Sequence, residues 1–207
     1  MVLILIDIQI MKTTVKNTFV LALAIFISSL SFSQTNLKFQ NKFVIILDVQ
    51  QEFTENSMSE ISAQKLIDSV NYVIENTDPK KVIYVSDTTV HKVLTISFKK
   101  GFTIDTTLSK YNFDNRLKLV NENIFCKTGA NAFESNELIN FLEENNAKEI
   151  VVIGLMAEGC ASATLYGGKE LGYEMYVIPE AIVGKSEKSK NKAVKKMKKN
   201  GIKVLHL

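Results

Sequence analysis

A cysteine between two apolar segments is the strongest candidate for a catalytic residue in this chain. Cys160 ends the sequence Gly154-Leu-Met-Ala-Glu-Gly-Cys160, where a strand-like run gives way to a helical pattern. A thiol at the N-terminus of a helix lies near the positive end of the helix dipole, which favours the thiolate. The free backbone N–H groups of such a turn can also stabilise an oxyanion. For Cys160 considered alone, an inert buried cysteine is the alternative and the better interpretation.

Two charged residues stand at the ends of other apolar runs. Asp48 follows Phe43–Leu47, and Lys127 follows Asn123–Cys126. A carboxylate at the end of a buried strand is costly unless it has a partner or a function, and Asp48 could accept the proton of a thiol. Lys127 could then stabilise the anions of Asp48 and Cys160. The alternatives are a loop-capping role for Asp48 and a solvated strand end for Lys127.

Apolar runs and helical patterns alternate along most of the chain. Strands are predicted at residues 43–47, 82–85, 123–126, 149–153, 174–178 and 202–205, and helices at 61–74, 135–142, 161–171 and 187–199, with Ser59 capping the first helix and Pro179 ending the fifth strand. Strands that alternate with helices form parallel sheets covered on both faces. The sequence therefore predicts an α/β fold, a three-layer α/β/α arrangement with a mostly parallel sheet of about six strands.

The predicted topology brings distant residues together. Right-handed crossovers place the C-terminal ends of parallel strands at one edge, where ligands bind in open α/β sheets. Asp48, Asp87, Lys127 and the turn before Cys160 each follow a predicted strand. We therefore expect these four positions to converge on one site.

Residues 88–120 show the weakest pattern. A hairpin at residues 93–98 and 102–104, around Gly101, and one or two helical turns at 114–120 are predicted. A long excursion of this kind in an α/β domain often forms a lid or pocket wall.

Composition sets limits on the partners. The chain has 207 residues, 46% hydrophobic and 23% charged, with a formal net charge of +3. That charge is too small to indicate nucleic-acid binding. Eight lysines fall between Lys185 and Lys199. A solvated face of an amphipathic helix is favoured there over a basic patch that binds an anionic membrane or nucleic acid.

The N-terminal segment has the pattern of a secretory signal. Lys12 and Lys16 precede an apolar run at Phe19–Ile27, and Ser31 and Ser33 are small residues suited to cleavage before residue 34. A membrane anchor is the alternative, but the run is shorter than the roughly 20 residues that span a bilayer. We predict a signal peptide at residues 1–33, with Met11 as a candidate start, and one domain at residues 34–207. The product is expected in the periplasm or outside the cell, with no membrane association after cleavage.

Four segments together resemble one known family, the isochorismatase-like hydrolases. The segments are FVIILDVQQEF at Phe43–Phe53, CKTGANAFESNEL at Cys126–Leu138, VVIGLMAEGCASAT at Val151–Thr164 and GYEMYVIPEAI at Gly172–Ile182. The resemblance covers roughly residues 42–207. All three candidate catalytic positions occur in the family's order.

The resemblance implies a mechanism and further site residues. Asp48 would be the general base, Cys160 the nucleophile and Lys127 the charge-stabilising residue. It also implies a cis peptide at Leu155–Met156 and an oxyanion hole formed by the backbone N–H groups of Met156 and Cys160. Phe53 and Phe133 are expected to line the substrate pocket.

The departures from the family narrow the activity. Nicotinamidase relatives carry a metal site of one Asp and several His, whereas this chain offers Asp87, His91 and only one other histidine, His206. No metal and no cofactor are therefore expected. Relatives that hydrolyse isochorismate lack the cysteine, so Cys160 favours cleavage of a small amide or ureido compound. A catalytically silent binding or assembly protein is the alternative, and a homo-oligomer would be typical of the family.

The two cysteines are predicted to remain unpaired. Cys126 directly precedes Lys127, and successive strand side chains point to opposite faces. If Lys127 faces the site, Cys126 faces away from it as a buried free thiol. A redox pair of Cys126 and Cys160 is the alternative.

Overall fold

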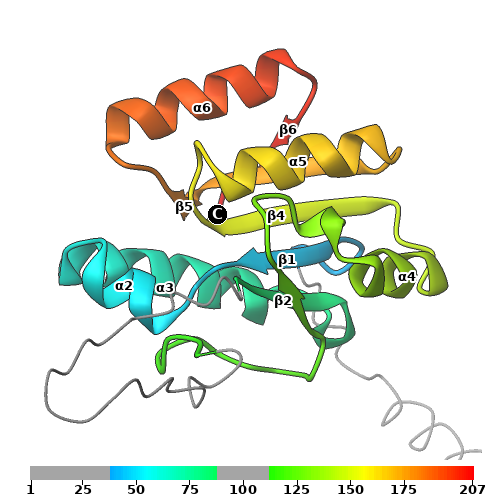
Figure 1. Ribbon diagram of the computed structural model, residues 1–207, viewed down its shortest axis with the longest axis horizontal. Coiled ribbons are helices and arrows are strands. Elements are labelled where there is room, and N and C mark those ends of the chain that lie inside the picture. Colours follow the sequence, from blue (N-terminus) through cyan, green and yellow to red (C-terminus); the bar gives the residue numbers. More distant parts are fainter. Residues whose placement is uncertain (1–37, 88–111) are drawn as a thin grey trace, which may run out of the picture. The chain divides into compact units, whose positions relative to one another are not determined.

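Within the residues that the structure describes, six strands form one sheet in the order β3-β2-β1-β4-β5-β6, and all neighbouring strands run parallel. The structure is a computed structural model that describes residues 38–87 and 112–207 (Figure 1). The strands are β1 (Phe43–Leu47), β2 (Val82–Asp87), β3 (Ile124–Lys127), β4 (Glu149–Leu155), β5 (Glu174–Val183) and β6 (Lys203–Val204). The predicted fold class is confirmed.

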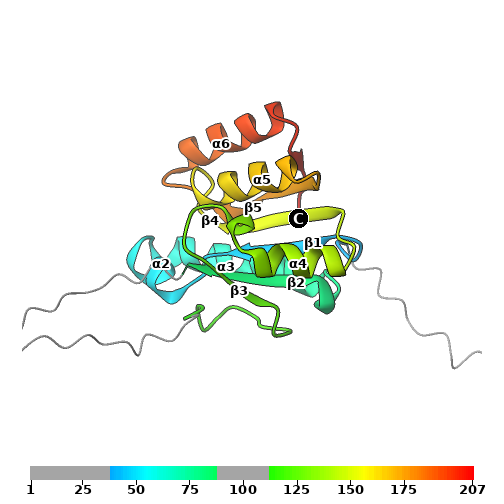
Figure 2. The same cartoon turned by 45° about the vertical axis from the view of Figure 1, so that its right-hand side comes forward.

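Helices cover both faces of this sheet. They are α2 (Gln51–Asn56), α3 (Glu60–Glu75), α4 (Asn136–Glu144), α5 (Cys160–Glu170) and α6 (Glu187–Lys199), with short 3-10 turns η1 (Pro79–Lys81) and η2 (Ala132–Glu134). α3 lies on one face, and α4, α5 and α6 lie on the other (Figures 1 and 2). Right-handed crossovers explain this division, because the chain moves outward in opposite directions from β1 and from β4.

The central strands are apolar because both of their faces are covered. β1 is buried along its whole length, and β2 and β4 are buried except at one end. Serine residues begin three of the helices: Ser59, Ser135 and Ser186 each accept a hydrogen bond from a backbone N–H of the following turn. Such caps satisfy N–H groups that have no partner inside the helix. The predicted cap at Ser59 is confirmed.

One predicted strand end and one predicted helical segment are wrong. β5 does not end at Pro179 but continues to Val183, with a register shift opposite β4 that pairs Val152 with Val177 and Gly154 with Ile182. A bulge of this kind accommodates a proline, which has no backbone N–H to donate. Residues 114–120 form no helix. The side chain of Asp114 instead accepts a hydrogen bond from the Arg116 backbone N–H at 2.9 Å, which makes a local turn.

Several sequence-based expectations fall outside the described residues. They are the signal peptide at 1–33, the hairpin at 93–98 and 102–104, and His91. In the described ranges, the helices are all too short or too polar to cross a membrane.

Candidate active site

Four adjacent strands bring four side chains to one edge of the sheet. Asp48 follows β1, Asp87 ends β2, Lys127 ends β3, and Cys160 begins α5 after β4. β1 and β4 are neighbours at the point where the strand order reverses, and ligands bind at such switch points in open α/β sheets. The predicted convergence of these residues is what the structure shows.

The backbone holds Asp48 in a distinctive position. Its φ angle is +55°, in the left-handed region that aspartate tolerates better than most residues. Its N–H donates to the Val85 carbonyl at 2.9 Å, and its carbonyl accepts from the Gln50 N–H at 2.8 Å. The chain therefore turns sharply after β1, and Asp48 is only 3% exposed.

Gly154 allows β1 and β4 to approach closely beside Asp48. A Cβ atom at Gly154 would lie 2.1 Å from the Leu47 carbonyl oxygen, and the φ angle of this glycine is +108°. Both observations restrict the position to glycine. The peptide bond between the following two residues, Leu155 and Met156, is cis, as the family resemblance implied.

Lys127 joins the acidic and thiol groups of the site. Its Nζ atom lies 3.0 Å from Asp48 Oδ2, 3.4 Å from Asp87 Oδ2 and 3.5 Å from Cys160 Sγ. The Lys127 side chain is fully buried. A buried ammonium requires this kind of compensation by nearby acceptors.

The electrostatics favour a charged pair of Asp48 and Lys127. Burial raises the pKa of Asp48, although Lys127 and the Cys160 thiol act in the opposite direction. Burial lowers the pKa of Lys127, but Asp48, Cys160 and Asp87 outweigh it, so the net direction is upward. Asp48 is thus a stronger base than an ordinary aspartate, beside a firmly protonated lysine.

Cys160 is a protonated thiol in this setting. Burial and the negative charge of Asp48 raise the pKa of Cys160 to about 11, and Lys127 only partly offsets them. This direction is opposite to the one that the sequence analysis expected from the helix N-terminus. A base must remove the thiol proton during any reaction, and Asp48 is positioned beside it.

Asp87 was expected at this edge of the sheet, and the structure places it beside Lys127. Gln50 holds it from both sides: the Asp87 N–H donates to Gln50 Oε1 at 2.9 Å, and Gln50 Nε2 donates to the Asp87 carbonyl at 3.3 Å. The Asp-x-Gln spacing after β1 was the available signal, since the glutamine comes two residues after Asp48.

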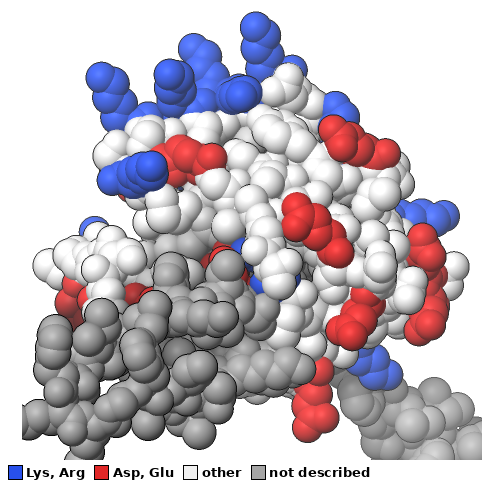
Figure 3. Space-filling view, in the orientation of Figure 1, with Lys and Arg blue, Asp and Glu red and all other residues white. Residues whose placement is uncertain are grey.

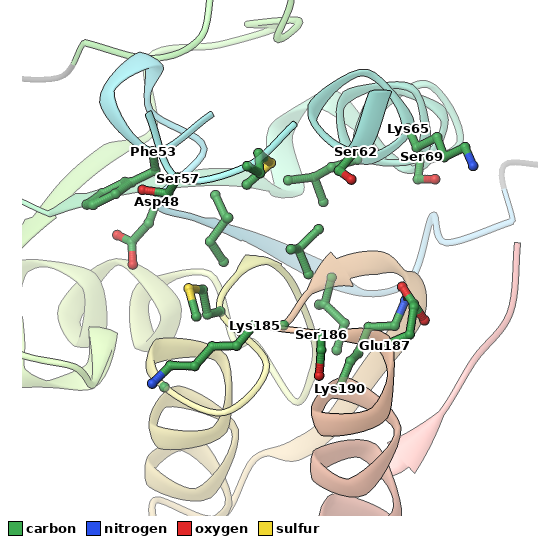
Figure 4. A pocket seen from close by; sticks show the side chains of 18 of the residues that line it. Asp48, Phe53, Ser57, Ser62, Lys65, Ser69, Lys185, Ser186, Glu187 and Lys190 are labelled. Carbon is green, nitrogen blue, oxygen red and sulfur yellow. The ribbon is translucent and has the colours of Figure 1, made fainter. Parts of the chain in front are cut away.

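A cavity of about 1190 Å³ opens beside these residues (Figure 4). α3 contributes Ser62, Lys65 and Ser69 to one wall, and the start of α6 contributes Glu187 and Lys190 to another. The described lining residues are Asp48, Phe53, Ser57, Met58, Ser59, Ser62, Lys65, Leu66, Asp68, Ser69, Asp87, Leu155, Met156, Gly159, Cys160, Glu180, Ile182, Val183, Gly184, Lys185, Ser186, Glu187 and Lys190.

Of the two phenylalanines expected in the pocket, one lines it. Phe53 is a lining residue. Phe133 is not among the described lining residues; it is 6% exposed and stacks on Tyr173 with ring centroids 5.6 Å apart. The expectation for Phe133 is wrong because η2 turns its ring into the hydrophobic core against α5.

The lysines of α6 differ in how far their side chains are exposed. Lysine side chains gather over α6 on the surface (Figure 3), in agreement with the predicted solvated face. Lys190 differs, because its side chain is only 14% exposed and it lines the cavity. Its ion-pair partner, Glu187 at 3.0 Å, is 80% exposed. The sequence run alone did not separate Lys190 from its neighbours.

The backbone N–H groups expected to form the oxyanion hole lie in the turn after β4. Within the described residues, neither Met156 nor Cys160 donates its N–H to a backbone carbonyl. The Met156 carbonyl instead accepts from the N–H groups of Gly159 and Ala161, at 2.9 and 3.2 Å. These bonds close the turn that carries Cys160 into α5.

Both cysteines are free thiols, as predicted. Cys126 Sγ lies 3.7 Å from the Ser86 hydroxyl. Cys126 and Lys127 are successive residues of β3, and successive strand side chains point to opposite faces. Cys126 is half-buried, so it is more exposed than expected.

A metal set of the kind implied by the family does not fit the described residues. Asp87 Oδ2 is engaged with Lys127, whose positive charge opposes a cation there. His206 lies in the C-terminal segment and its Nδ1 is 2.7 Å from Glu180 Oε1. His91 lies outside the described residues.

Comparison with known proteins identifies related chains. A family model described as an isochorismatase domain matches residues 42–207. An uncharacterised isochorismatase family protein of Bacillus subtilis is 27% identical over 146 residues, covering 69% of this chain and 73% of its own. A secreted isochorismatase effector of Verticillium dahliae is 25% identical over 157 residues, covering 76% of this chain and 80% of its own.

Solved structures share the fold. The crystal structure of a pyrazinamidase of Pyrococcus horikoshii, in complex with zinc, superimposes with a TM-score of 0.60 at 23% identity. The match covers 81% of this chain and 99% of the pyrazinamidase.

Proposed function

The chain belongs to the isochorismatase family of hydrolases, and from that membership we propose that it is a cysteine hydrolase that cleaves a C–N bond of a small amide or ureido compound. The observation that carries the proposal is the contact of one buried ammonium, Lys127 Nζ, with both Asp48 and Cys160. The adjoining cavity gives the thiol access to a small molecule.

In the first step, Asp48 accepts the thiol proton while Cys160 Sγ attacks the carbonyl carbon of the substrate. The base is required because the pKa of Cys160 is about 11. Lys127 stays protonated and stabilises the charge that passes between the two groups. Nucleophilic catalysis of this kind divides one difficult displacement into two easier steps.

The tetrahedral intermediate then collapses to a thioester on Cys160. The C–N bond breaks, and the proton held by Asp48 passes to the leaving nitrogen, which departs as ammonia or an amine. Water, deprotonated by Asp48, attacks the thioester, so that the acid is released and the thiol is restored. We propose that the backbone N–H groups of Met156 and Cys160 hold the oxyanion in both steps.

A screen of small amides and ureido compounds tests the proposal. Release of ammonia or amine, together with an acyl adduct on Cys160 seen by mass spectrometry after acid quenching, is expected for a substrate. Cys160→Ala is the control and should show neither. Turnover by Cys160→Ala at the wild-type rate would refute the assignment. No adduct with any compound, and a thiol inert to alkylation even at high pH, would favour a silent binding protein.

We also propose that residues 1–33 are an export signal and that residues 34–207 are the functional domain. The charge, apolar and small-residue order of the segment supports this. The relative from Verticillium dahliae is itself a secreted protein. A periplasmic or extracellular hydrolase is the consequence.

A further inference from the structure

We propose that Glu158 is a positioning residue that holds the cavity wall at the start of α6 in place against the turn that carries Cys160. Glu158 lies two residues before Cys160 and does not line the cavity among the described residues. It therefore acts on the cavity through the residues that it contacts. The contacts of Glu158 do not depend on the proposed function, but the expected effect of Glu158 on turnover rests on that function.

Two hydrogen bonds join the turn to the segment between β5 and α6. The Ala157 N–H donates to the Val183 carbonyl at 2.8 Å. The Lys185 N–H donates to Glu158 Oε1 at 3.1 Å. The first bond joins two backbone groups and does not depend on a side chain. The second bond requires the Glu158 carboxylate. A substitution of Glu158 should therefore weaken the contact between the turn and this segment.

One of the two carboxylate oxygens of Glu158 is buried at the junction. Its Oε2 atom is buried and has no hydrogen-bond partner within the described residues. Burial raises the pKa of Glu158, but the Ser189 side chain and the Lys185 N–H lower it below its ordinary value. A buried, ionised oxygen without a full set of partners is unfavourable, so the surrounding contacts must hold this side chain in position.

The backbone at Gly184 lies close to the same carboxylate. A Cβ atom at Gly184 would lie 2.8 Å from both carboxylate oxygens of Glu158 and 3.0 Å from Lys190 Cβ. The separation from Glu158 is shorter than real Cβ contacts, so the carboxylate or the turn would have to shift. The position of the Glu158 carboxylate therefore depends on the absence of a side chain at residue 184.

Both sides of the junction face the cavity. Met156, Gly159 and Cys160 line it from the turn, and Gly184 and Lys185 begin the opposing wall. Figure 4 shows Lys185, Ser186, Glu187 and Lys190 following one another along that wall. If the Glu158 contact is lost, the wall is free to move relative to the thiol, and access to Cys160 changes without any change in the reacting groups.

Alkylation by iodoacetamide measures that access without a substrate. We expect Glu158→Ala to raise the alkylation rate of Cys160 about fivefold, which is the size of effect that loss of one partly exposed hydrogen bond can produce. Cys126 is the internal control, because local opening should leave its rate unchanged and general unfolding should raise both rates. Glu170→Ala, an exposed glutamate at the far end of α5, is the matched control and should change neither rate. An unchanged Cys160 rate in Glu158→Ala would overturn the proposal.

A double-mutant cycle tests the contact itself. Gly184→Ala should also raise the Cys160 rate, because the added methyl displaces the Glu158 carboxylate. In the Glu158→Ala background only the contact with Lys190 Cβ remains, so Gly184→Ala should raise the rate by a smaller factor than it does in the wild type. Effects that simply multiply in the double variant would show that the two residues act separately, and the proposal would fail. Glu158→Gln should retain most of the wild-type behaviour, since its amide oxygen can still accept from the Lys185 N–H.

Turnover separates this proposal from the proposed function. On a confirmed substrate, Glu158→Ala should raise KM more than it lowers kcat, because the reacting groups stay intact. If no substrate is found, the alkylation results still decide the role of Glu158. If Cys160→Ala retains turnover while the alkylation cycle behaves as expected, only the catalytic assignment is wrong.

Discussion

The carboxylate of Asp48 lies 3.0 Å from the ammonium of Lys127, although Asp48 follows β1 and Lys127 ends β3, two strands that are not neighbours in the sheet. β2 lies between their strands and contributes Asp87, whose Oδ2 is 3.4 Å from the same ammonium. One lysine thus compensates two carboxylates and also contacts the Cys160 thiol. Removal of any of these groups should have consequences that can be measured separately.

Loss of the nucleophile or the base should abolish turnover. We expect Cys160→Ala and Asp48→Asn each to lower kcat by about 10³-fold or more, because each removes a group that acts in the same unit. For the same reason the double variant should be little worse than either single one. Circular dichroism should show folded protein in all three. A double variant whose losses multiply would contradict a shared mechanism.

Lys127→Met should destabilise the fold. The change leaves the carboxylates of Asp48 and Asp87 near each other without their cation, and breaking a buried pair costs about 3 kcal/mol. Urea unfolding at neutral pH measures the effect. Lys192→Met on the exposed face of α6 is the matched control and should change the free energy of unfolding little. Equal stability of the two variants would argue against the buried charge cluster.

The pH dependence of Cys160 alkylation should report the charges around it. In the wild-type protein the rate should rise with pH as the thiol, with a pKa of about 11, ionises. Asp48→Asn removes a charge that raises the pKa of Cys160, so its profile should move to lower pH. Lys127→Met removes a charge that lowers it, so its profile should move to higher pH. Shifts in the same direction for both variants would be inconsistent with the described geometry.

Acid should weaken the turn that leads toward β3. Hydrogen bonds from Arg116 lower the pKa of Asp114 to about 2 from an ordinary value of 3.8. A carboxyl with a depressed pKa in the folded state stabilises the fold above pH 3.8, and this contribution is lost as the pH falls through about 2. Asp114→Asn should therefore cost about 1 kcal/mol at pH 7, allowing for solvent screening of the partly exposed arginine. The difference from wild type should disappear near pH 2 in thermal unfolding.

Export should remove the N-terminal segment. Mass spectrometry of protein secreted by its native host should show a mature chain that begins near residue 34. A mature product that retains Met1 or Met11 would contradict the export signal at residues 1–33.

Much of this architecture was predictable because local patterns carry it. β1 occupies the predicted residues 43–47, and α6 occupies the predicted residues 187–199. Continuous apolar runs and serine caps are properties of short segments, so they can be recognised without knowing their partners. The order of Asp48, Lys127 and Cys160 along the chain, each after a strand, was also sufficient to predict their convergence.

The tertiary structure decided what depends on neighbours from other segments. Phe133 and Lys190 both carry plausible side chains for their predicted roles, but packing turns Phe133 into the core and Lys190 toward the cavity. The thiol of Cys160 is protonated because burial and Asp48 outweigh Lys127, a balance of distances that no sequence pattern contains. The sequence by itself determined most of the strands and helices and the residues available for chemistry. Only the fold determined their charges and exposure, because both depend on atoms that lie far away along the chain.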